Sequence, residues 1–377
     1  MNNSLQYLHG GSPGLDLARF GLAERTVLDF SVNLNALGIP EIVKEKWKET
    51  LNAVEGYPSV EGDGVSHYYK KKFGIPSQNF LAGNGSTEMI YLIPRTLRLK
   101  RFLVITPSYY DYERASVLAG SAVTRVPLSP DAGFSFPDMN DLIAALNNSD
   151  GLWLGRPNNP TGHLFPKGQL LELADRFPDH LFIIDEAFIQ FTDRWTESSL
   201  MTDKVRPNIL VVHSLTKFYA LAGLRIGGVV GHSKVISRLR QSKEPWTVNG
   251  IADRVAPLLL ECINYEKRTR REVALERERI FRGLKQLDGI IPFPCSANFI
   301  LCRWTRTENL DDLVHYLLEN SAYVRDCRNF PGLENNFFRI GLRSPDDNDK
   351  LMSIISSFPY ADSGVRACAK EVIPHHD

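Results

Sequence analysis

The middle of the chain alternates between short apolar runs with strand character and longer segments with helical spacing. Such alternation is typical of an α/β domain whose sheet is mostly parallel and is flanked by helices. Ligands of these sheets bind at the carboxyl ends of the strands, so the polar residues at those ends are the candidate functional residues. The predicted strands are 101–106, 122–127, 151–155, 181–184, 209–213 and 226–230, and the predicted helices between them are 108–119, 138–146 and 167–177.

The two ends of the chain extend this pattern. A strand-like run and several helices flank the middle region, and a smaller α+β pattern begins at residue 292. We expect residues 1–35 to form an arm that belongs to a small domain, 36–285 to form the large domain, and 286–377 to form the small domain. The flanking run is 27–35 with helices at 41–54, 64–73, 232–241 and 249–287; the small domain has strands at 298–304, 322–325 and 337–341 and helices at 308–319 and 346–357.

Bulk composition limits the class of partner. Lys+Arg and Asp+Glu both number 44, so the formal charge of zero does not favour nucleic acid or an anionic membrane. The chain has no apolar run of about 18 residues and no basic segment followed by an apolar one at its start. The five cysteines contain no C-x-x-C pair, and no spacing typical of a metal site occurs. We expect a cytoplasmic protein with free thiols, no metal and a small-molecule substrate.

Lys217 lies among apolar and small residues in the stretch from His213 to Gly228. Poor solvation lowers the cost of a neutral amine, and a neutral amine is nucleophilic toward a carbonyl, with which it can form a Schiff base. The hydroxyls of Ser214 and Thr216 suit a phosphate, and Arg225 is a permanent cation that pairs with phosphate or carboxylate. A group that carries both an aldehyde and a phosphate is pyridoxal phosphate, which we predict as the cofactor.

Two predicted strands end in residues that suit the ring of this cofactor. The turn that follows 151–155 presents Asn159, and the strand 181–184 is followed by Asp185. A pyridinium ring needs a donor for its phenolic oxygen and an anion for its ring nitrogen, and these two side chains supply them. Each turn alone is also compatible with a plain loop, so the prediction depends on finding both upstream of Lys217 and Arg225.

A glycine-rich turn, Gly85-Ser86-Thr87, directly precedes an amphipathic helix. Free backbone N–H groups at a helix start bind phosphate, although the same residues also serve as a simple helix cap. Tyr109 follows the strand 101–106, where its ring either stacks on a planar cofactor or packs in the core.

Several further residues are candidates for binding an anionic substrate. Arg339 stands inside the apolar strand Phe337-Phe338-Arg339-Ile340 and must find an anion, for which a substrate carboxylate is the prediction. Arg325 lies in the same crowded group of arginines. His9, beside two glycines, is either a turn residue or a donor to an anion, and Asn33 is either a turn residue or a site residue.

These motifs together resemble the fold-type I pyridoxal phosphate enzymes of the aminotransferase class I/II superfamily over residues 9–357. Within it the chain is similar to the histidinol-phosphate aminotransferase subgroup, and it resembles most strongly the decarboxylases that act on L-threonine O-3-phosphate in cobalamin biosynthesis. The resemblance is carried by His9-Gly10-Gly11, Ser31-Val32-Asn33-Leu34-Asn35, Asp185-Glu186-Ala187-Phe188, Ser214 to Tyr219, Pro245-Trp246 and Val324 to Leu333.

The resemblance implies a role for each candidate around the cofactor. Lys217 forms the Schiff base and moves protons, Asp185 keeps the pyridine nitrogen protonated, and Asn159 holds the phenolic oxygen. Tyr109 stacks on the ring. The cofactor's phosphate is held by Gly85, Ser86, Thr87, Ser214, Thr216 and Arg225.

The resemblance also assigns the substrate contacts and the assembly. Arg339 binds the α-carboxylate, while His9, Asn33 and Arg325 lie near the substrate phosphate. Asn159 is a substrate contact as well. Tyr57 reaches the cofactor of the neighbouring subunit in a homodimer with shared active sites.

Two departures from the transaminating relatives favour decarboxylation. Those relatives usually have tyrosine where this chain has Phe188, and an acidic residue where Leu34 stands between two asparagines. We therefore expect conversion of L-threonine O-3-phosphate to (R)-1-amino-2-propanol O-phosphate and CO₂, with histidinol-phosphate transamination as the alternative. A cofactor-sensing transcription factor would need a DNA-binding domain for which the chain has no spare length, and a phosphate-binding protein without the cofactor is the remaining alternative.

Overall fold

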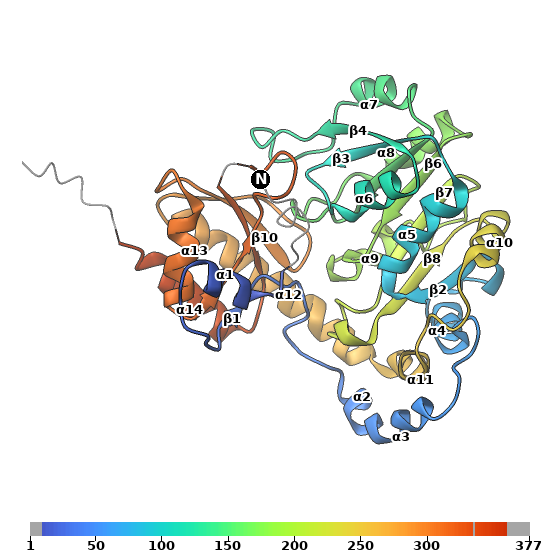
Figure 1. Cartoon of the computed structure of the whole chain (residues 1–377), viewed down its shortest axis with the longest axis horizontal. Helices are drawn as coiled ribbons and strands as arrows, with labels where there is room; N and C mark the ends of the chain where they lie inside the picture. The colour runs from blue at the N-terminus through green and yellow to red at the C-terminus, as the bar shows by residue number, and fades with distance from the viewer. Residues whose placement is uncertain (1–9, 335, 360–377) are drawn as a thin grey trace, which may run out of the picture.

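The computed structural model describes residues 10–334 and 336–359, and these form two lobes (Figure 1). The large lobe is built on one seven-stranded sheet in the order β2-β8-β7-β6-β5-β3-β4. Neighbouring strands are parallel except at β8, which is antiparallel to both β2 and β7. The strands are β2 (Phe80–Asn84), β3 (Arg101–Thr106), β4 (Ala122–Pro127), β5 (Gly151–Gly155), β6 (Leu181–Asp185), β7 (Ile209–Ser214) and β8 (Ile226–Val230). The mostly parallel sheet expected from the sequence is confirmed.

Helices cover both faces of this sheet, which explains why its central strands read as continuous apolar runs. Successive residues of a strand point to opposite faces, so Leu152 and Leu154 enter one buried cluster while Trp153 enters another. The helices of the large lobe are α2 (Glu41–Glu45), α3 (Trp47–Leu51), α4 (Asp63–Phe73), α5 (Gly85–Leu97), α6 (Asp111–Leu118), α7 (Met139–Leu146), α8 (Lys167–Arg176), α9 (Trp195–Ser198), α10 (Ser233–Ser242) and α11 (Gly250–Leu258).

The small lobe combines the two ends of the described chain. An antiparallel sheet in the order β12-β13-β10-β9 forms its centre, and the N-terminal strand β1 pairs in parallel with β11. Its strands are β1 (Leu28–Asp29), β9 (Ile290–Pro292), β10 (Phe299–Trp304), β11 (Ala322–Tyr323), β12 (Arg325–Asp326) and β13 (Phe337–Gly341), and its helices are α1 (Pro13–Arg19), α13 (Leu310–Glu319) and α14 (Pro345–Ser356).

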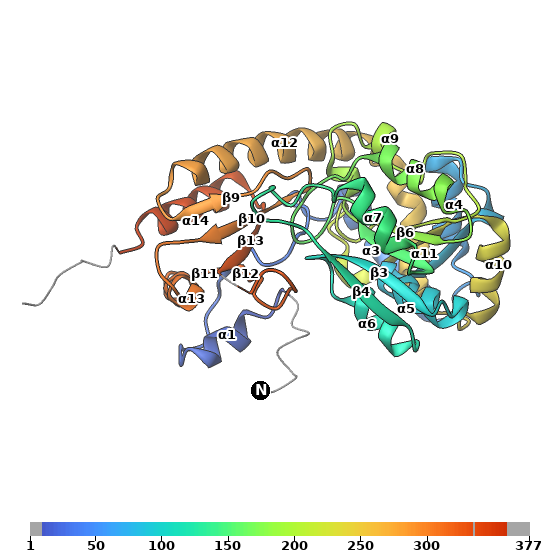
Figure 2. The ribbon, with the colours of Figure 1, turned by 90° about the horizontal axis from the view of Figure 1, so that it is seen from above.

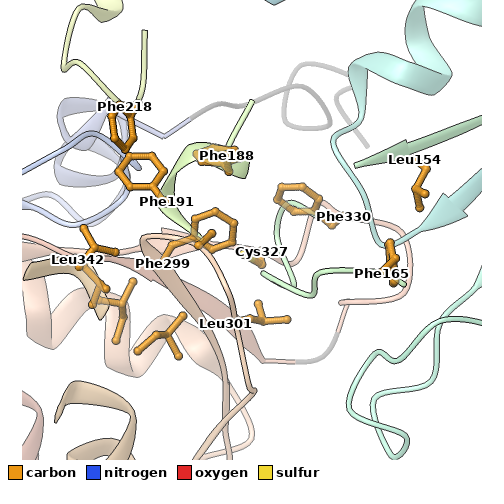
Figure 3. Close-up of a cluster of buried hydrophobic side chains, with 14 of the residues drawn as sticks. Leu154, Phe165, Phe188, Phe191, Phe218, Phe299, Leu301, Cys327, Phe330 and Leu342 are labelled. Atoms are coloured by element: carbon orange, nitrogen blue, oxygen red, sulfur yellow. The ribbon is translucent and has the colours of Figure 1, made fainter. Parts of the chain in front are cut away.

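Besides the chain segment between β1 and α2, two features join the lobes. The helix α12 (Ile263–Gln286) runs along both of them (Figure 2). A buried apolar cluster also crosses between them, in which Phe188 of the large lobe meets Phe299 of the small lobe edge-on, with ring centroids 5.1 Å apart (Figure 3). The two lobes therefore share one core beside the ends of the sheet. No helix among residues 10–334 and 336–359 has the length and apolar composition to cross a bilayer.

The structure corrects several element boundaries. The strands β2 and β9 were not predicted, and the expected strand 322–325 is divided between β11 and β12, which belong to different sheets. The expected helix 249–287 is two helices, α11 and α12, because Pro257 cannot donate a backbone hydrogen bond and a short 3₁₀ turn follows it. The expected helix 41–54 consists of short pieces interrupted at Lys46. The last part of the expected small domain, from residue 360 to 377, lies outside the described residues.

Candidate active site

A cavity of about 370 Å³ lies where the carboxyl ends of β5, β6 and β7 face the small lobe. Most of the residues singled out in the sequence line this one cavity, as the topology of a parallel sheet requires. Gly85 lies directly beside it, against Arg225. The predicted residues on its wall are Asn33, Ser86, Thr87, Tyr109, Asn159, Asp185, Ser214, Thr216, Lys217, Arg225, Arg325 and Arg339.

Lys217 lies on the turn that follows β7 and faces the cavity. Burial lowers the pKa of its amine to about 8, and the cations Arg225 and Arg339 lower it as well, while Asp185 opposes them. A much larger fraction of this amine is therefore neutral at neutral pH than for an ordinary lysine. The arrangement suits a nucleophile that attacks a carbonyl.

Asp185 ends β6 and is 7% exposed. One of its carboxylate oxygens accepts a hydrogen bond from the backbone N–H of Ala187 at 2.9 Å, and the other accepts one from the Tyr112 hydroxyl at 2.8 Å. Burial raises the pKa of this carboxyl to about 6 in spite of those bonds. A buried carboxylate without an ion-pair partner among the described residues is a ready partner for a cationic ring nitrogen.

The residues predicted to hold the cofactor's phosphate, here called the cradle, lie together at one end of the cavity. Gly85 begins α5 with a φ of 73°, and a Cβ atom there would lie 2.7 Å from Nη2 of Arg225. That nitrogen donates to Oγ1 of Thr87 at 3.2 Å. On the facing turn, the hydroxyls of Ser214 and Thr216 lie 2.7 Å apart. A helix N-terminus, hydroxyl groups and a guanidinium thus converge at one end of the cavity, which is the donor set that a phosphate binds.

Arg339 reaches the same cavity from β13 and is 5% exposed. Its guanidinium donates to Oδ1 of Asn159 and, at 2.8 Å, to the carbonyl of Ser31, whereas its Nε has no partner among the described residues. Burial lowers the pKa of this guanidinium to about 10, and the nearby cation Arg325 acts in the same direction. The protein supplies amide and carbonyl oxygens around this cation and leaves one donor open to a ligand.

Arg325 stands directly opposite Arg339, because the two residues are paired in the register of β12 and β13. It is 6% exposed, donates to Oδ1 of Asn329 at 2.9 Å, and lies over the ring of Phe330 at 5.3 Å. Asn33 is equally buried on the cavity wall, and its Oδ1 has no partner among the described residues. These side chains form a polar wall that faces the cradle and Lys217.

Three predicted residues are not placed at the cavity wall. Tyr57 is 88% exposed and makes an aromatic contact with Trp246, so its predicted reach into a neighbouring subunit stays a prediction. His9 lies outside the described residues, although Gly10, which follows it, lines the cavity. Gly85 lies behind the cavity wall, against the guanidinium of Arg225.

Sequence reasoning missed the hydroxyl that binds Asp185. Tyr112 is fully buried among aromatic rings and lies three residues after Tyr109 at the start of α6, so helical spacing places both rings on one face. A run of tyrosines at the end of a predicted strand was the available signal.

A buried ion pair beside the site was also missed. Nη1 of Arg156 lies 3.2 Å from Oε1 of Glu186, with side-chain exposures of 2% and 0%. Each residue directly follows the last residue of its strand, β5 or β6, so the pair ties together the turns that carry Asn159 and Asp185. The sequence signal was a charged residue next to each predicted strand end.

These groups fit pyridoxal phosphate. The cradle at the start of α5 suits the phosphate, the buried Asp185 suits a cationic ring nitrogen, and Lys217 suits the aldehyde carbon. Each of these residues alone could have a purely structural role. Together on one cavity they match the phosphate, the ring nitrogen and the aldehyde of the cofactor.

Comparison with known proteins agrees with this geometry. The family model described as aminotransferase class I and II matches residues 25–355. The threonine-phosphate decarboxylase of Salmonella typhimurium is 33% identical over 352 residues, which cover 92% of this chain and 95% of that protein.

Two solved structures show the same fold. The histidinol-phosphate aminotransferase from Clostridium acetobutylicum superposes with a TM-score of 0.81 at 28% identity, covering 87% of this chain and 98% of that one. The L-threonine-O-3-phosphate decarboxylase from Porphyromonas gingivalis superposes with a TM-score of 0.76 at 26% identity, covering 88% and 99%. The chain therefore belongs to the aminotransferase class I and II family, and the pyridoxal phosphate-dependent superfamily predicted from its sequence is confirmed.

Proposed function

We propose that this protein uses pyridoxal phosphate to decarboxylate L-threonine O-3-phosphate to (R)-1-amino-2-propanol O-phosphate and CO₂. The observation that carries the proposal is the pair of buried guanidinium groups, Arg325 and Arg339, on the wall of the cavity that contains Lys217. Two buried like charges side by side are costly in the empty protein, and a ligand with two anionic groups offsets that cost. Threonine phosphate carries such groups, a carboxylate and a phosphate, at a short separation.

Each of the two arginines binds one anionic group of the substrate. Arg339, which has an open donor beside Asn159, binds the α-carboxylate, and Arg325 with Asn33 binds the substrate phosphate.

Pyridoxal phosphate, when bound through Lys217, withdraws electrons from the bonds at the substrate's Cα. The residues of the chain decide which of those bonds breaks, because the bond held perpendicular to the ring is the one that is weakened. The carboxylate and phosphate anchors fix the orientation of Cα so that CO₂ leaves. The ammonium form of Lys217 would then deliver a proton to Cα, and a pKa of about 8 leaves that form available near neutral pH.

The alternative reaction is transamination of histidinol phosphate, which uses the same cradle and the same lysine. Its support is the likeness to the aminotransferase from Clostridium acetobutylicum. Phe188 favours decarboxylation. It lines the cavity with a ring that packs against Phe299, so the position offers no phenol to the cofactor.

The proposed reaction is tested with purified protein supplied with pyridoxal phosphate. Incubation with L-threonine O-3-phosphate is expected to release CO₂ and to form an amino alcohol phosphate. Incubation with histidinol phosphate and 2-oxoglutarate is expected to give neither glutamate nor CO₂. Glutamate formation without CO₂ from threonine phosphate would assign the transaminase reaction instead.

We also propose that the enzyme is a cytoplasmic homodimer. Its support is the exposed aromatic pair Tyr57 and Trp246 beside exposed Val54 and Val60, an apolar patch that a second copy can cover. The cysteines among the described residues are free thiols, which fits a reducing compartment. Sedimentation of the purified protein tests the dimer.

A further inference from the structure

The backbone of Lys217 lies on a turn and not in a helix or a strand. The segment from Leu215 to Leu221 closes on itself through bonds such as Leu221 N–H to the Thr216 carbonyl at 2.9 Å, and Ala220 in this turn has a φ of 51°. A neighbouring strand fixes this turn at its first residue, where the N–H of Leu215 donates to the Ile226 carbonyl of β8 at 3.0 Å. Beyond that residue the position of the amine depends on the other groups that bind the turn. A displacement of the backbone of this turn would also displace the amine nitrogen of Lys217.

Asn35 binds this turn through two successive carbonyl groups. Its backbone N–H donates to the Lys217 carbonyl at 3.1 Å, and its side-chain Nδ2 donates to the Phe218 carbonyl at 2.7 Å. Its Oδ1 accepts from the N–H of Leu37 at 3.0 Å, and the residue is only 4% exposed. Asn33, two residues earlier, lines the cavity instead, so this segment departs from the regular alternation of a strand, in which residues two apart would share a face.

The second hydrogen of the Asn35 amide reaches the helix α12. It is donated to Oγ1 of Thr269 at 2.8 Å, and Thr269 is fully buried. From the same helix, the Tyr265 hydroxyl donates to the Gly38 carbonyl at 2.7 Å and lies 3.3 Å from the Phe218 carbonyl. The arm that carries Asn35 and the helix α12 are both connections between the lobes (Figure 2), and both meet at the lysine turn.

The side chain of Phe218 completes the attachment from the other side. Its ring packs edge-on against Phe191 at 5.1 Å, within the apolar cluster that joins the lobes (Figure 3). The residue after the reactive lysine is therefore held by its ring in the core and by its carbonyl on Asn35. Both hydrogens and the oxygen of the Asn35 amide are used inside the protein, and none of them faces the cavity.

We infer that Asn35 is a positioning residue for Lys217, which fixes the lysine turn to the two segments that connect the lobes. The inference rests on the proposed function, because it assumes that Lys217 carries the cofactor. It assigns to the second asparagine of the segment Ser31 to Asn35 a role distinct from the cavity-facing role of Asn33.

The test compares Asn35→Ala with Asn208→Ala in the full-length protein loaded with pyridoxal phosphate. Asn208 is a matched control, because it is buried and its Nδ2 also bonds two backbone carbonyls, those of Ala174 and Phe177, away from the cavity. Both variants should lose similar thermal stability. Only Asn35→Ala should lower kcat, by about tenfold, and its KM should change by less than about threefold. A tenfold loss corresponds to the free energy of about one buried hydrogen bond, here one that positions Lys217 for the reaction.

A second readout does not depend on turnover. The visible circular-dichroism band of the lysine-bound cofactor requires one fixed orientation, so Asn35→Ala should weaken it and Asn208→Ala should not. If Asn35→Ala does not fold, Thr269→Val removes only the contact to α12 and should change kcat and the band in the same direction. Equal effects of the Asn35→Ala and Asn208→Ala variants overturn the inference, and so does an unchanged band in Asn35→Ala. If Asn35→Ala does not fold, an unchanged band in Thr269→Val overturns it.

The same measurements separate this inference from the proposed reaction. An unaltered protein that shows the band but releases no CO₂ from threonine phosphate refutes the proposed reaction, while the band still tests Asn35. An unaltered protein without any band refutes both.

Discussion

Arg325 and Arg339 face each other across the register of two antiparallel strands, both are buried, and both line the cavity of Lys217. Like charges directly opposite in a sheet destabilise it, and burial increases that cost. Under the proposed function, a ligand with two negative groups offsets part of this cost. Removing one of these arginines should therefore affect protein stability and catalysis in different ways.

The first prediction concerns Arg339→Met. Removing this guanidinium should lower kcat/KM for threonine phosphate roughly 10- to 100-fold, because a charge-assisted hydrogen bond to the carboxylate is lost. The thermal stability of the cofactor-free protein should stay the same or rise, since a buried like charge is removed. Arg303→Met is the control, because Arg303 is an exposed residue of the neighbouring strand β10. A variant with unchanged kcat/KM would show that Arg339 does not bind the substrate.

The second prediction concerns the pH dependence of stability. Burial raises the pKa of Asp185 to about 6 from an ordinary value of 3.8, so the native state keeps its proton at pH values where the unfolded state has lost it. This group should therefore reduce the free energy of unfolding of the cofactor-free protein as pH rises from about 4 to 6, by at most about 3 kcal/mol. Asp185→Asn should lack this loss. Denaturant unfolding measures the free energy of unfolding of both proteins. The two values should be most alike at pH 4, and the variant should be relatively more stable above pH 6. A difference between the two values that does not depend on pH would contradict the prediction.

The third prediction concerns the hydroxyl of Tyr112. Tyr112→Phe removes the donor to Asp185 but keeps the ring that stacks on Trp153, whose centroid is 5.1 Å away. The loss of one buried hydrogen bond should weaken the affinity for pyridoxal phosphate about fivefold to tenfold, as measured by titration of the cofactor-free protein. Tyr323→Phe removes a comparable bond, to Asp16 in the small lobe, and should leave that affinity unchanged. Equal affinities for both variants would exclude a role for Tyr112.

The fourth prediction concerns the amine of Lys217. Only the neutral amine attacks the cofactor, so the rate at which added pyridoxal phosphate becomes attached should rise with pH and reach half its maximum near pH 8. The Arg339→Met variant should shift this midpoint upward, because Arg339 is one of the cations that lower the pKa of the lysine. Growth of the visible absorbance band measures the rate. A midpoint near 10, typical of an exposed lysine, would contradict the burial argument.

The sequence by itself determined the central sheet and the residues at its strand ends. Strands β5 and β6 and most of β7 are apolar because both faces are covered, and polar residues such as Asn159, Asp185 and Ser214 gather where the strands end. Parallel strands bring their carboxyl ends to one edge, so residues far apart along the chain could be assigned to one site without knowing the packing.

Only the tertiary structure decided which partners those residues have. The strand β2 contains small residues and a glycine, so its pattern is weak, and it exists because it pairs with the glycines of β8. The contacts of Arg325 with Arg339, of Tyr112 with Asp185 and of Asn35 with the lysine turn are likewise set by strand register, helix packing and the path of an arm between the lobes. Periodicity in a sequence records which face of an element is buried, but a hydrogen bond depends on the distance between two particular atoms, and folding alone brings those atoms together.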